Sequence, residues 1–282
     1  MAAVGAGIES DRAAIRGRGR VLANEADGTG HKLLLAVPDW PGAIPGQFVM
    51  VGAGAEAGVP RRDPLLSRPM AVYRELGADA DSGQPRVELL YRVVGRGTTL
   101  LSEAEPGQSI SLVGPLGCGF PIASEGGLAI LVGGGTGIAS LFELARSLRS
   151  VGRRVLVILG ARSADDLVGR SDFAELDVEL LYATEDGSEG TKGLVTVPLR
   201  ERLTTERAAG VYAVGPTAMM RACAELARAH GARCLVSLEN PMACGFGVCL
   251  GCAVPRAEGG FSLVCRAGPV FDAEEIDWEG LP

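Results

Sequence analysis

The sequence predicts an α+β protein of several domains: an antiparallel β-barrel, a doubly wound α/β sheet and a small C-terminal domain. Three observations lead to this prediction. Short strand-like runs with glycine and proline between them fill the first part of the chain. Strands alternate with amphipathic helices in the middle, and four clustered cysteines mark the end. With 282 residues, of which 47% are hydrophobic, the chain can bury the cores that this arrangement needs.

The barrel is expected over residues 18–122, after a loose N-terminal extension at residues 1–17. Extended runs such as KLLLAV, QFVMV and RVELLYRVV are separated by glycine- and proline-containing turn segments such as PGAIPG and EPGQ. Several short strands with frequent turns are typical of a small antiparallel barrel.

The α/β sheet is expected over residues 123–239. Apolar runs such as LAILVGG, RRVLVILGA and AGVYAVG alternate with the amphipathic segments IASLFELARSLRSVG and TAMMRACAELARAHG. In the first of these segments the apolar positions recur at helical spacing, at Leu141, Leu144, Ala145 and Leu148. Strands that alternate with helices predict a parallel, doubly wound sheet.

Charge and hydropathy exclude several classes of partner. The net charge is −7 and no run is rich in Lys or Arg, so no nucleic-acid partner is expected. Residues 1–20 lack the apolar core of a signal peptide, and the longest uncharged stretch, 126–142, contains six glycines and is short for a membrane span. We therefore expect a cytoplasmic protein without membrane contact. In that reducing compartment, the seven cysteines argue against disulfides.

A glycine-rich turn, LVGGGTGIAS, links the first strand of the α/β region to its first helix. Such a turn lets backbone N–H groups approach a pyrophosphate at the helix N-terminus. The strict dinucleotide fingerprint is incomplete, because Ile138 replaces its third glycine and no acidic residue follows the next strand. A turn without a ligand is the alternative. The candidate nucleotide-binding residues are Gly133, Gly134, Gly135, Thr136 and Gly137.

The barrel region carries a second candidate site for phosphate. Arg68 and Pro69 lie in LSRPMAVYR, and Gly97 and Thr98 lie in YRVVGRGTTLLS. An Arg fork and a Gly-Thr turn both donate hydrogen bonds to phosphate oxygens. A surface Arg-Pro pair beside an ordinary turn would give the same pattern, so these residues by themselves are weak evidence.

The C-terminal cysteines have the spacing of metal ligands. Cys244, Cys249 and Cys252 follow the pattern C-x4-C-x2-C, and Cys265 follows after a gap of twelve residues. This spacing is typical of plant-type [2Fe–2S] ligation, and a four-cysteine zinc site is the alternative. Cys223 and Cys234 fall within a predicted helix and strand, where they are expected to be core residues.

The order of these features resembles the ferredoxin-NADP reductase superfamily. With the cysteines added, the chain resembles the electron-transfer subunits of NAD-dependent (class 1B) dihydroorotate dehydrogenases, from about Arg20 to Asp277. The motifs that carry the resemblance include PGQFVMV, RPMAV, YRVVGRGTTLLS, GPLGCGFP, LVGGGTGIASLFELA, EDGSEGTKG and SLENPMACGFGVCLGC.

The resemblance implies three cofactor sites. FAD would lie in the barrel, with its isoalloxazine and phosphates against Arg68, Pro69, Met70 and Ala71, further contacts from Leu90, Tyr91 and Arg92, and its diphosphate held by Gly97 and Thr98. NAD would bind the glycine-rich turn, and the four cysteines of residues 240–282 would hold a [2Fe–2S] cluster. Two positions depart from the family: Ala71 stands where Ser or Thr is usual, and Cys118 where Asn is common.

The resemblance also implies an activity and a partner. Electrons from dihydroorotate would pass from a separate FMN-containing catalytic subunit through [2Fe–2S] and FAD to NAD⁺, in a heterotetramer with two copies of each subunit. Two alternatives remain: a flavin and iron–sulfur NAD(P)H reductase for another acceptor, and a zinc-bearing binding module. Arg162 and Ser163 leave the choice between NAD and NADP open, because they could meet a 2′-phosphate.

Overall fold

The computed structural model describes residues 13–54, 63–122 and 126–281. Most of the expected N-terminal extension lies outside these residues. The first strand already begins at Ile15 and pairs with the strand that leaves the barrel, so residues 15–17 belong to the sheet.

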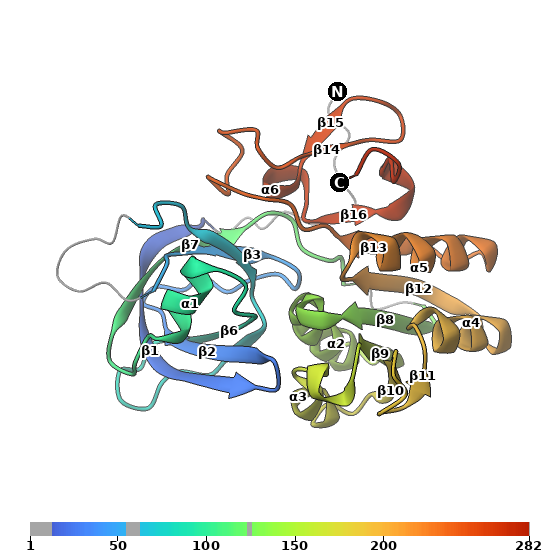
Figure 1. The fold of residues 1–282 in the computed structure, drawn as a ribbon, viewed down its shortest axis with the longest axis horizontal. Helices are drawn as coiled ribbons and strands as arrows, with labels where there is room; N and C mark the ends of the chain where they lie inside the picture. The colour runs from blue at the N-terminus through green and yellow to red at the C-terminus, as the bar shows by residue number, and fades with distance from the viewer. Residues whose placement is uncertain (1–12, 55–62, 123–125, 282) are drawn as a thin grey trace.

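The N-terminal part is an antiparallel sheet that curls on itself (Figure 1). Among the described residues its seven strands lie in the order β4 (Arg68–Ala71), β3 (Phe48–Val51), β7 (Ser109–Leu116), β1 (Ile15–Asp27), β2 (Gly30–Ala36), β6 (Arg86–Tyr91) and β5 (Arg74–Leu76). The two edge strands, β4 and β5, are separated in the chain only by Val72 and Tyr73. The sheet must therefore curl until its edges approach each other, which gives the predicted barrel-like shape.

Alternation of buried and less buried residues explains the barrel strands. In β7, Ile110 and Leu112 are buried while Ser109, Ser111 and Val113 are half-buried, as the two-residue period of a strand requires. The inward residues form one core, to which Leu33, Leu35 and Leu89 also contribute. The helix α1 (Arg96–Ser102) follows β6 and crosses the barrel (Figure 1).

The second part is the predicted α/β sheet. Its described strands lie in the order β11 (Thr191–Lys192), β10 (Glu179–Thr184), β9 (Val155–Ala161), β8 (Leu128–Gly134), β12 (Ala208–Val214), β13 (Cys234–Ser237) and β16 (Val270–Asp272). All neighbouring strands are parallel except β16, which runs antiparallel to β13.

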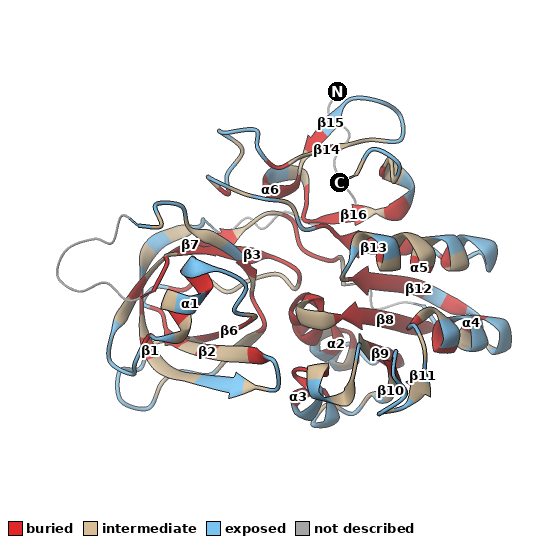
Figure 2. Ribbon diagram, in the orientation of Figure 1, coloured by how far each residue is buried: buried red, intermediate tan, exposed pale blue. Residues whose placement is uncertain are grey.

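Helices cover both faces of this sheet. Alternate residues of β8 point to opposite faces and pack in two different cores. Ala129 and Leu131 pack in the core that contains α2 (Ala139–Ser150) and α3 (Arg170–Ala174). Ile130 and Val132 pack in the core that contains α4 (Thr196–Thr205) and α5 (Thr217–Ala229). The central strand β8 is consequently buried along its whole length, and most residues of its neighbours β9 and β12 are buried too (Figure 2), as expected of a doubly wound sheet.

The C-terminal part begins after β13 and returns to the same sheet. The cysteine-bearing loop leads to the hairpin β14 (Ala253–Pro255) and β15 (Phe261–Leu263), then to α6 (Val264–Ala267) and the edge strand β16. The short 3-10 turns η1 (Gly135–Ile138), η2 (Ala164–Asp166) and η3 (Ala273–Glu275) complete the described elements. Part of the predicted 240–282 region thus extends the α/β sheet.

The C-terminal part also contacts the barrel. The backbone N–H of Cys118 donates to the carbonyl of Gly268 over 2.6 Å, and a Cβ on Gly245 would lie 2.4 Å from Cγ of Met50 in β3. The cysteine-bearing loop is therefore packed directly on the barrel wall. In the part of the chain that the structure describes, no helix has the length and apolarity to cross a membrane.

Candidate functional site

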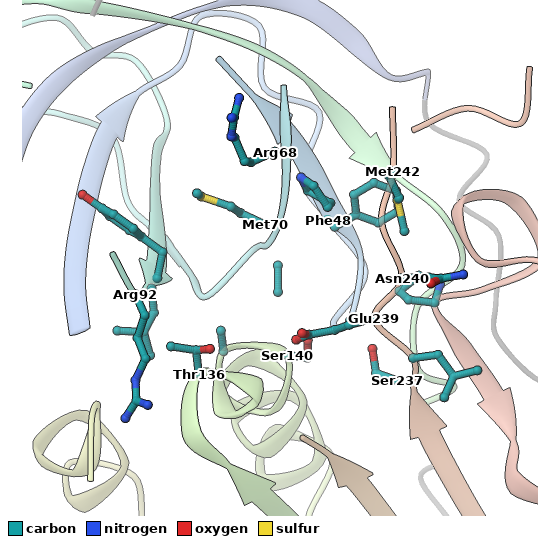
Figure 3. Close-up of a pocket in the computed structure, with 18 of the residues that line it drawn as sticks. Phe48, Arg68, Met70, Arg92, Thr136, Ser140, Ser237, Glu239, Asn240 and Met242 are labelled. Carbon is teal, nitrogen blue, oxygen red and sulfur yellow. The ribbon is translucent and has the colours of Figure 1, made fainter. Parts of the chain in front are cut away.

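A cavity of about 500 Å³ lies where the barrel, the start of α2 and the segment after β13 meet (Figure 3). The barrel strands β4 and β6 form one wall, Thr136 and Ser140 form the floor, and residues 237–242 close the third side. We call this space the flavin cavity. It lies at the carboxyl end of the parallel sheet, which is where ligands bind in doubly wound folds.

The flavin cavity collects residues that are far apart in the sequence. All the residues predicted for FAD line it except Gly97; these are Arg68, Pro69, Met70, Ala71, Leu90, Tyr91, Arg92 and Thr98. Its wall is largely apolar with a few basic and hydroxyl groups, which suits a flat aromatic ring that carries a diphosphate.

Gly97 does not line the cavity, but it contacts Arg68, which does. A Cβ at position 97 would lie 2.1 Å from Nε of Arg68, so the guanidinium rests on the bare backbone of this glycine. Next to it, Oγ1 of Thr98 accepts hydrogen bonds from the backbone N–H groups of Val94 (2.9 Å) and Gly95 (3.2 Å). These contacts fix the turn into α1 at the cavity edge.

Arg92 connects the barrel to the α/β sheet. Its Nη2 donates to Oγ1 of Thr29 over 2.8 Å and to Oδ1 of Asp166 over 3.0 Å. Its Nε is buried and has no hydrogen-bond partner among the described residues. A buried donor without a partner is costly in a folded protein, so the open side of this guanidinium is suited to an anionic or carbonyl ligand.

Two further cavities continue from the flavin cavity along the carboxyl ends of the parallel strands. The first, of about 370 Å³, adjoins it and shares Arg92, Thr136 and Glu239 with it. The second, of about 460 Å³, lies beyond it at the ends of β9 and β10 and shares Gly134, Gly135 and Pro216 with the first. We call these the near and far nucleotide cavities. Together they form a track long enough for a dinucleotide, with one end against the flavin cavity.

The glycine-rich turn lies on this track as predicted, with one exception. Gly134 and Gly135 line both nucleotide cavities, and Thr136 and Gly137 line the near one. Gly135 has φ +57°, a conformation that favours glycine. Gly133 lines neither cavity: it is buried in β8, where a Cβ would lie 2.6 Å from Cγ2 of Ile138. Its role is close packing of strand against helix.

The four candidate ligand cysteines lie as two pairs. The sulfurs of Cys252 and Cys265 are 3.2 Å apart and buried, and the thiol of Cys249 hydrogen-bonds that of Cys244. Burial opposes ionisation of Cys244, but hydrogen bonds from the backbone N–H groups of Cys249 and Phe246 lower its pKa to about 6. For Cys265, burial and the Cys252 sulfur raise the pKa to about 12.

This donor set fits a [2Fe–2S] cluster. Each iron of such a cluster takes two thiolates, which matches the two cysteine pairs, three of whose members lie on one loop and the fourth, Cys265, in α6; backbone N–H groups already point at the Cys244 sulfur. Among the described residues, no three His, Cys, Asp or Glu side chains converge in the way that a single metal ion requires. The pairing of the four cysteines is what fits the cluster.

The structure also locates the remaining cysteines and Ala71, the alanine that departs from the family pattern. Cys223 and Cys234 are buried in α5 and β13, and burial raises the pKa of Cys223 to about 12. Cys118 is also buried, and its thiol donates to the carbonyl of Arg266 over 3.2 Å, beside the ligand cysteine 265. Ala71 lines the flavin cavity and brings no hydroxyl to it.

Sequence reasoning missed the third wall of the flavin cavity. Ser237, Glu239, Asn240 and Met242 line it, and Glu239 also lines the near nucleotide cavity. The motif SLENPMACG holds these residues. In the sequence only its cysteine belongs to a recognisable ligand pattern. The other residues form part of a site only because the fold brings this segment to the barrel.

Comparison with known proteins supports these assignments. A family model described as the iron–sulfur cluster binding domain of dihydroorotate dehydrogenase B matches residues 239–277. A second, the oxidoreductase NAD-binding domain, matches residues 131–225. The chain is thus an NAD-linked oxidoreductase subunit with FAD and [2Fe–2S] as its cofactors.

Several proteins resemble the chain over most of its length. The electron transfer subunit of dihydroorotate dehydrogenase B (NAD(+)) from Geobacillus sp. (strain WCH70) is 41% identical over 236 residues, which are 82% of this chain and 86% of that protein. A homolog of that subunit from Aquifex aeolicus is 37% identical over 250 residues, covering 87% and 92%. A solved NADH-dependent reduced ferredoxin-NADP oxidoreductase superposes with a TM-score of 0.80 at 32% identity, covering 93% and 90%. The three cavities, the cysteine pairs and these relatives lead to one conclusion: the chain belongs to the family of dihydroorotate dehydrogenase B electron transfer subunits.

Proposed function

We propose that the chain accepts electrons from an FMN-containing dihydroorotate dehydrogenase catalytic subunit and delivers them to NAD⁺. FAD, when bound, exchanges single electrons on one side and a hydride on the other. The observation that carries the proposal is the order of the sites: the cysteine pairs, the flavin cavity, the near nucleotide cavity and the far nucleotide cavity adjoin one another in that sequence.

The segment after β13 brings the cluster site close to the flavin cavity. Met242 lines the cavity and Cys244 follows two residues later. Two residues span at most about 7 Å of extended chain, so the cluster ligand and the cavity wall are near neighbours. The loop is also held against β3 by the contact of Gly245 with Met50. These contacts favour a fixed, short separation between the two proposed redox sites.

The cluster loop, residues 244–252, offers a face to the catalytic subunit. Phe246, Val248 and Leu250 are 54%, 73% and 63% exposed, and Phe261 in β15 is 74% exposed. Figure 2 shows this end of the molecule as largely exposed. Apolar side chains that gather around a redox site mark a partner surface. Cys249 is itself exposed on the same loop, which suits electron entry from a docked subunit.

The assembly and location are part of the same proposal. We place the chain in a heterotetramer with two copies of each subunit, in the cytoplasm. None of the seven cysteines forms a disulfide in the described structure, as suits a reducing compartment. The assembly is tested by measuring the mass of the native complex in solution.

A second candidate function follows from the solved oxidoreductase above. That protein is an NADH-dependent reduced ferredoxin-NADP oxidoreductase, and it is 32% identical to this chain. A subunit of such an enzyme would use the same cofactors with another electron donor. The two functions differ in the partner that docks on the cluster loop.

Reconstitution with a dihydroorotate dehydrogenase B catalytic subunit separates them. The proposal expects dihydroorotate-driven reduction of NAD⁺ that depends on this chain. The variant Val248→Asp should abolish that activity and the complex, while direct reduction of its flavin by NADH continues. Val151→Asp, at an exposed valine beyond α2, is the control and should assemble normally. If the native chain forms no complex and supports no coupled turnover, this function is wrong and the ferredoxin-linked one is favoured.

A further inference from the structure

Glu239 lies at the junction of two cavities. It lies two residues beyond the end of β13, lines the flavin cavity and also lines the near nucleotide cavity. Figure 3 shows its carboxylate directed into the cavity toward Ser140 at the start of α2. No hydrogen bond or ion pair to this carboxylate is formed within the described part of the chain, although Arg92 lines both of the same cavities.

The proposed electron route creates a need for one proton. Reduction of FAD by the cluster brings two electrons, one at a time, and no proton. Transfer of a hydride to NAD⁺ removes two electrons and one proton. Each turnover therefore requires that one proton reach the flavin from another source: FAD + 2e⁻ + H⁺ gives FADH⁻, and FADH⁻ + NAD⁺ gives FAD + NADH. In the reverse direction the same proton must leave.

The walls of these cavities contain a single suitable group. Among the described residues that line the flavin cavity or the near nucleotide cavity, Glu239 is the only carboxylate, and none is His, Lys, Asp or Cys. Arg68 and Arg92 remain protonated at every relevant pH. Burial raises the pKa of Tyr91 to about 12, and its hydroxyl is engaged with Oδ1 of Asn24 at 3.1 Å.

The surroundings of Glu239 suit proton transfer. Glu239 is an exposed residue, but neighbouring protein partly desolvates its carboxylate, which raises its pKa above the ordinary value. The side chain nevertheless remains accessible from the cavity, so it can exchange its proton with water. A general acid–base group works best when its pKa lies near the working pH.

We propose that Glu239 is the proton-transfer residue of the flavin, giving it one proton when electrons arrive from the cluster and taking it back when electrons leave that way. The proposal rests on the electron route of the proposed function. Ala71 on the opposite wall has no hydroxyl to relay a proton, so the carboxylate serves the flavin directly or through one water.

The test uses the full FAD- and cluster-loaded chain without any partner, so failure of the dihydroorotate assignment would not affect it. Glu239→Gln removes the acid and keeps the shape, Glu239→Asp keeps the acid, and Glu201→Gln on the exposed surface of α4 is the control. Stopped-flow absorbance first follows reduction of FAD by one equivalent of NADH. Cytochrome c is then added as a one-electron acceptor, and the return of oxidised FAD is followed.

The two steps should respond differently. Hydride transfer from NADH needs no proton from the protein, so Glu239→Gln should slow this step far less than it slows reoxidation. Reoxidation, which must release the proton, should slow by about 100-fold or more, since general acid–base groups contribute typically 10²–10⁴-fold. Glu239→Asp should restore part of the rate. Unchanged reoxidation in Glu239→Gln would overturn the proposal, and so would an equal loss of both steps, which would indicate that Glu239 only positions the nicotinamide.

A second measurement does not depend on turnover. The infrared difference spectrum between oxidised and reduced protein should contain the carbonyl stretch of a carboxylic acid that changes protonation. This band should be absent from Glu239→Gln and present in Glu201→Gln. A native spectrum without such a band, or one that keeps it in Glu239→Gln, would exclude Glu239 as the proton carrier.

Discussion

Lys32 in β2 and Asp172 in α3 form a buried ion pair across the junction of the barrel and the α/β sheet, with 2.5 Å between Nζ and Oδ2. Asp172 also accepts hydrogen bonds from the hydroxyl of Tyr73 (2.6 Å) and from Nη1 of Arg74 (3.0 Å). Burial and the nearby Asp172 carboxylate raise the pKa of Tyr73, which keeps its hydroxyl a donor. This network fixes the flavin cavity relative to the nucleotide cavities.

Loss of the Asp172 charge should destabilise the protein strongly. Asp172→Asn leaves Lys32 and Arg74 buried beside an uncharged amide, and breaking a buried ion pair costs about 3–5 kcal/mol. Glu225→Gln removes the exposed pair with Arg221 and should change the free energy of unfolding by less than about 1 kcal/mol. Denaturant unfolding of both variants measures the difference. Equal stability of the two would show that the network does not hold the domains together.

Gly97→Ala should weaken FAD binding while the fold persists. The new Cβ would displace the Arg68 guanidinium, which is the movable end of a side chain, so the backbone can remain in place. Arg68 would then lose its position on the cavity wall, and we expect at least about a tenfold rise in the Kd of FAD, the loss of roughly one charge-assisted hydrogen bond.

The matched control for this change lies two residues away. Gly95→Ala adds a Cβ that meets nothing within 4 Å, on extended backbone. Titration of flavin-free protein with FAD should give nearly native affinity for this variant. Native affinity in Gly97→Ala as well would mean that Arg68 does not contact the cofactor.

The native protein should release about one FAD, and no FMN, on acid treatment.

Cys249→Ser should remove or cripple the cluster and leave the flavin. A Ser oxygen is a poor ligand for cluster iron, whereas the FAD residues belong to a different part of the fold. NADH should still reduce the FAD, and dihydroorotate-driven reduction of NAD⁺ in the reconstituted complex should fail. Iron analysis and the paramagnetic resonance of the reduced protein report the cluster.

Cys223→Ala provides the comparison for the cluster variant. Cys223 is buried in α5 and is not part of either cysteine pair, so this variant should keep its iron. Full coupled turnover and an unchanged resonance signal in Cys249→Ser would show that Cys249 is not a ligand. Coupled turnover without a cluster would contradict the electron route itself.

Glu185 should set the preference for NAD over NADP. It follows β10, lines the far nucleotide cavity and has no side-chain partner among the described residues. A free carboxylate there accepts a hydrogen bond from a ribose hydroxyl and repels a 2′-phosphate. The other acid, Asp166, is already paired with Arg92 at 3.0 Å, and Arg162 lies 4.0 Å from it.

Substitution at this position should therefore relax the specificity. Glu185→Gln should raise kcat/KM for NADPH about tenfold relative to NADH, roughly the effect of removing one repulsive contact. Arg162→Ala tests the opposite preference. Arg162 lines the same cavity and is the cation that a 2′-phosphate would contact. A native enzyme that prefers NADPH, and loses that preference in Arg162→Ala, would contradict the assignment.

Local chemistry in the sequence determined a large part of this protein. The two-residue and helical periods in β7 and α2 indicate which faces are buried, and these follow from local geometry alone. The spacing of Cys244, Cys249 and Cys252 is also local, because one short loop must present all three thiolates. The position of Arg68 beside Gly97, in contrast, depends on a strand, β4, and a helix, α1, that are not neighbours in the chain.

Only the tertiary structure decided which residues meet at the reactive centre. Glu239 is an ordinary acid between a strand and a loop in the sequence, and it becomes the single proton carrier of two cavities because β13 ends beside α2 and the barrel. Gly133 and Gly134 are adjacent in one motif, yet packing against Ile138 removes the first from the ligand track. Composition and spacing specify the chemistry that a segment can perform. Long-range packing determines which groups share a cavity and which groups are desolvated.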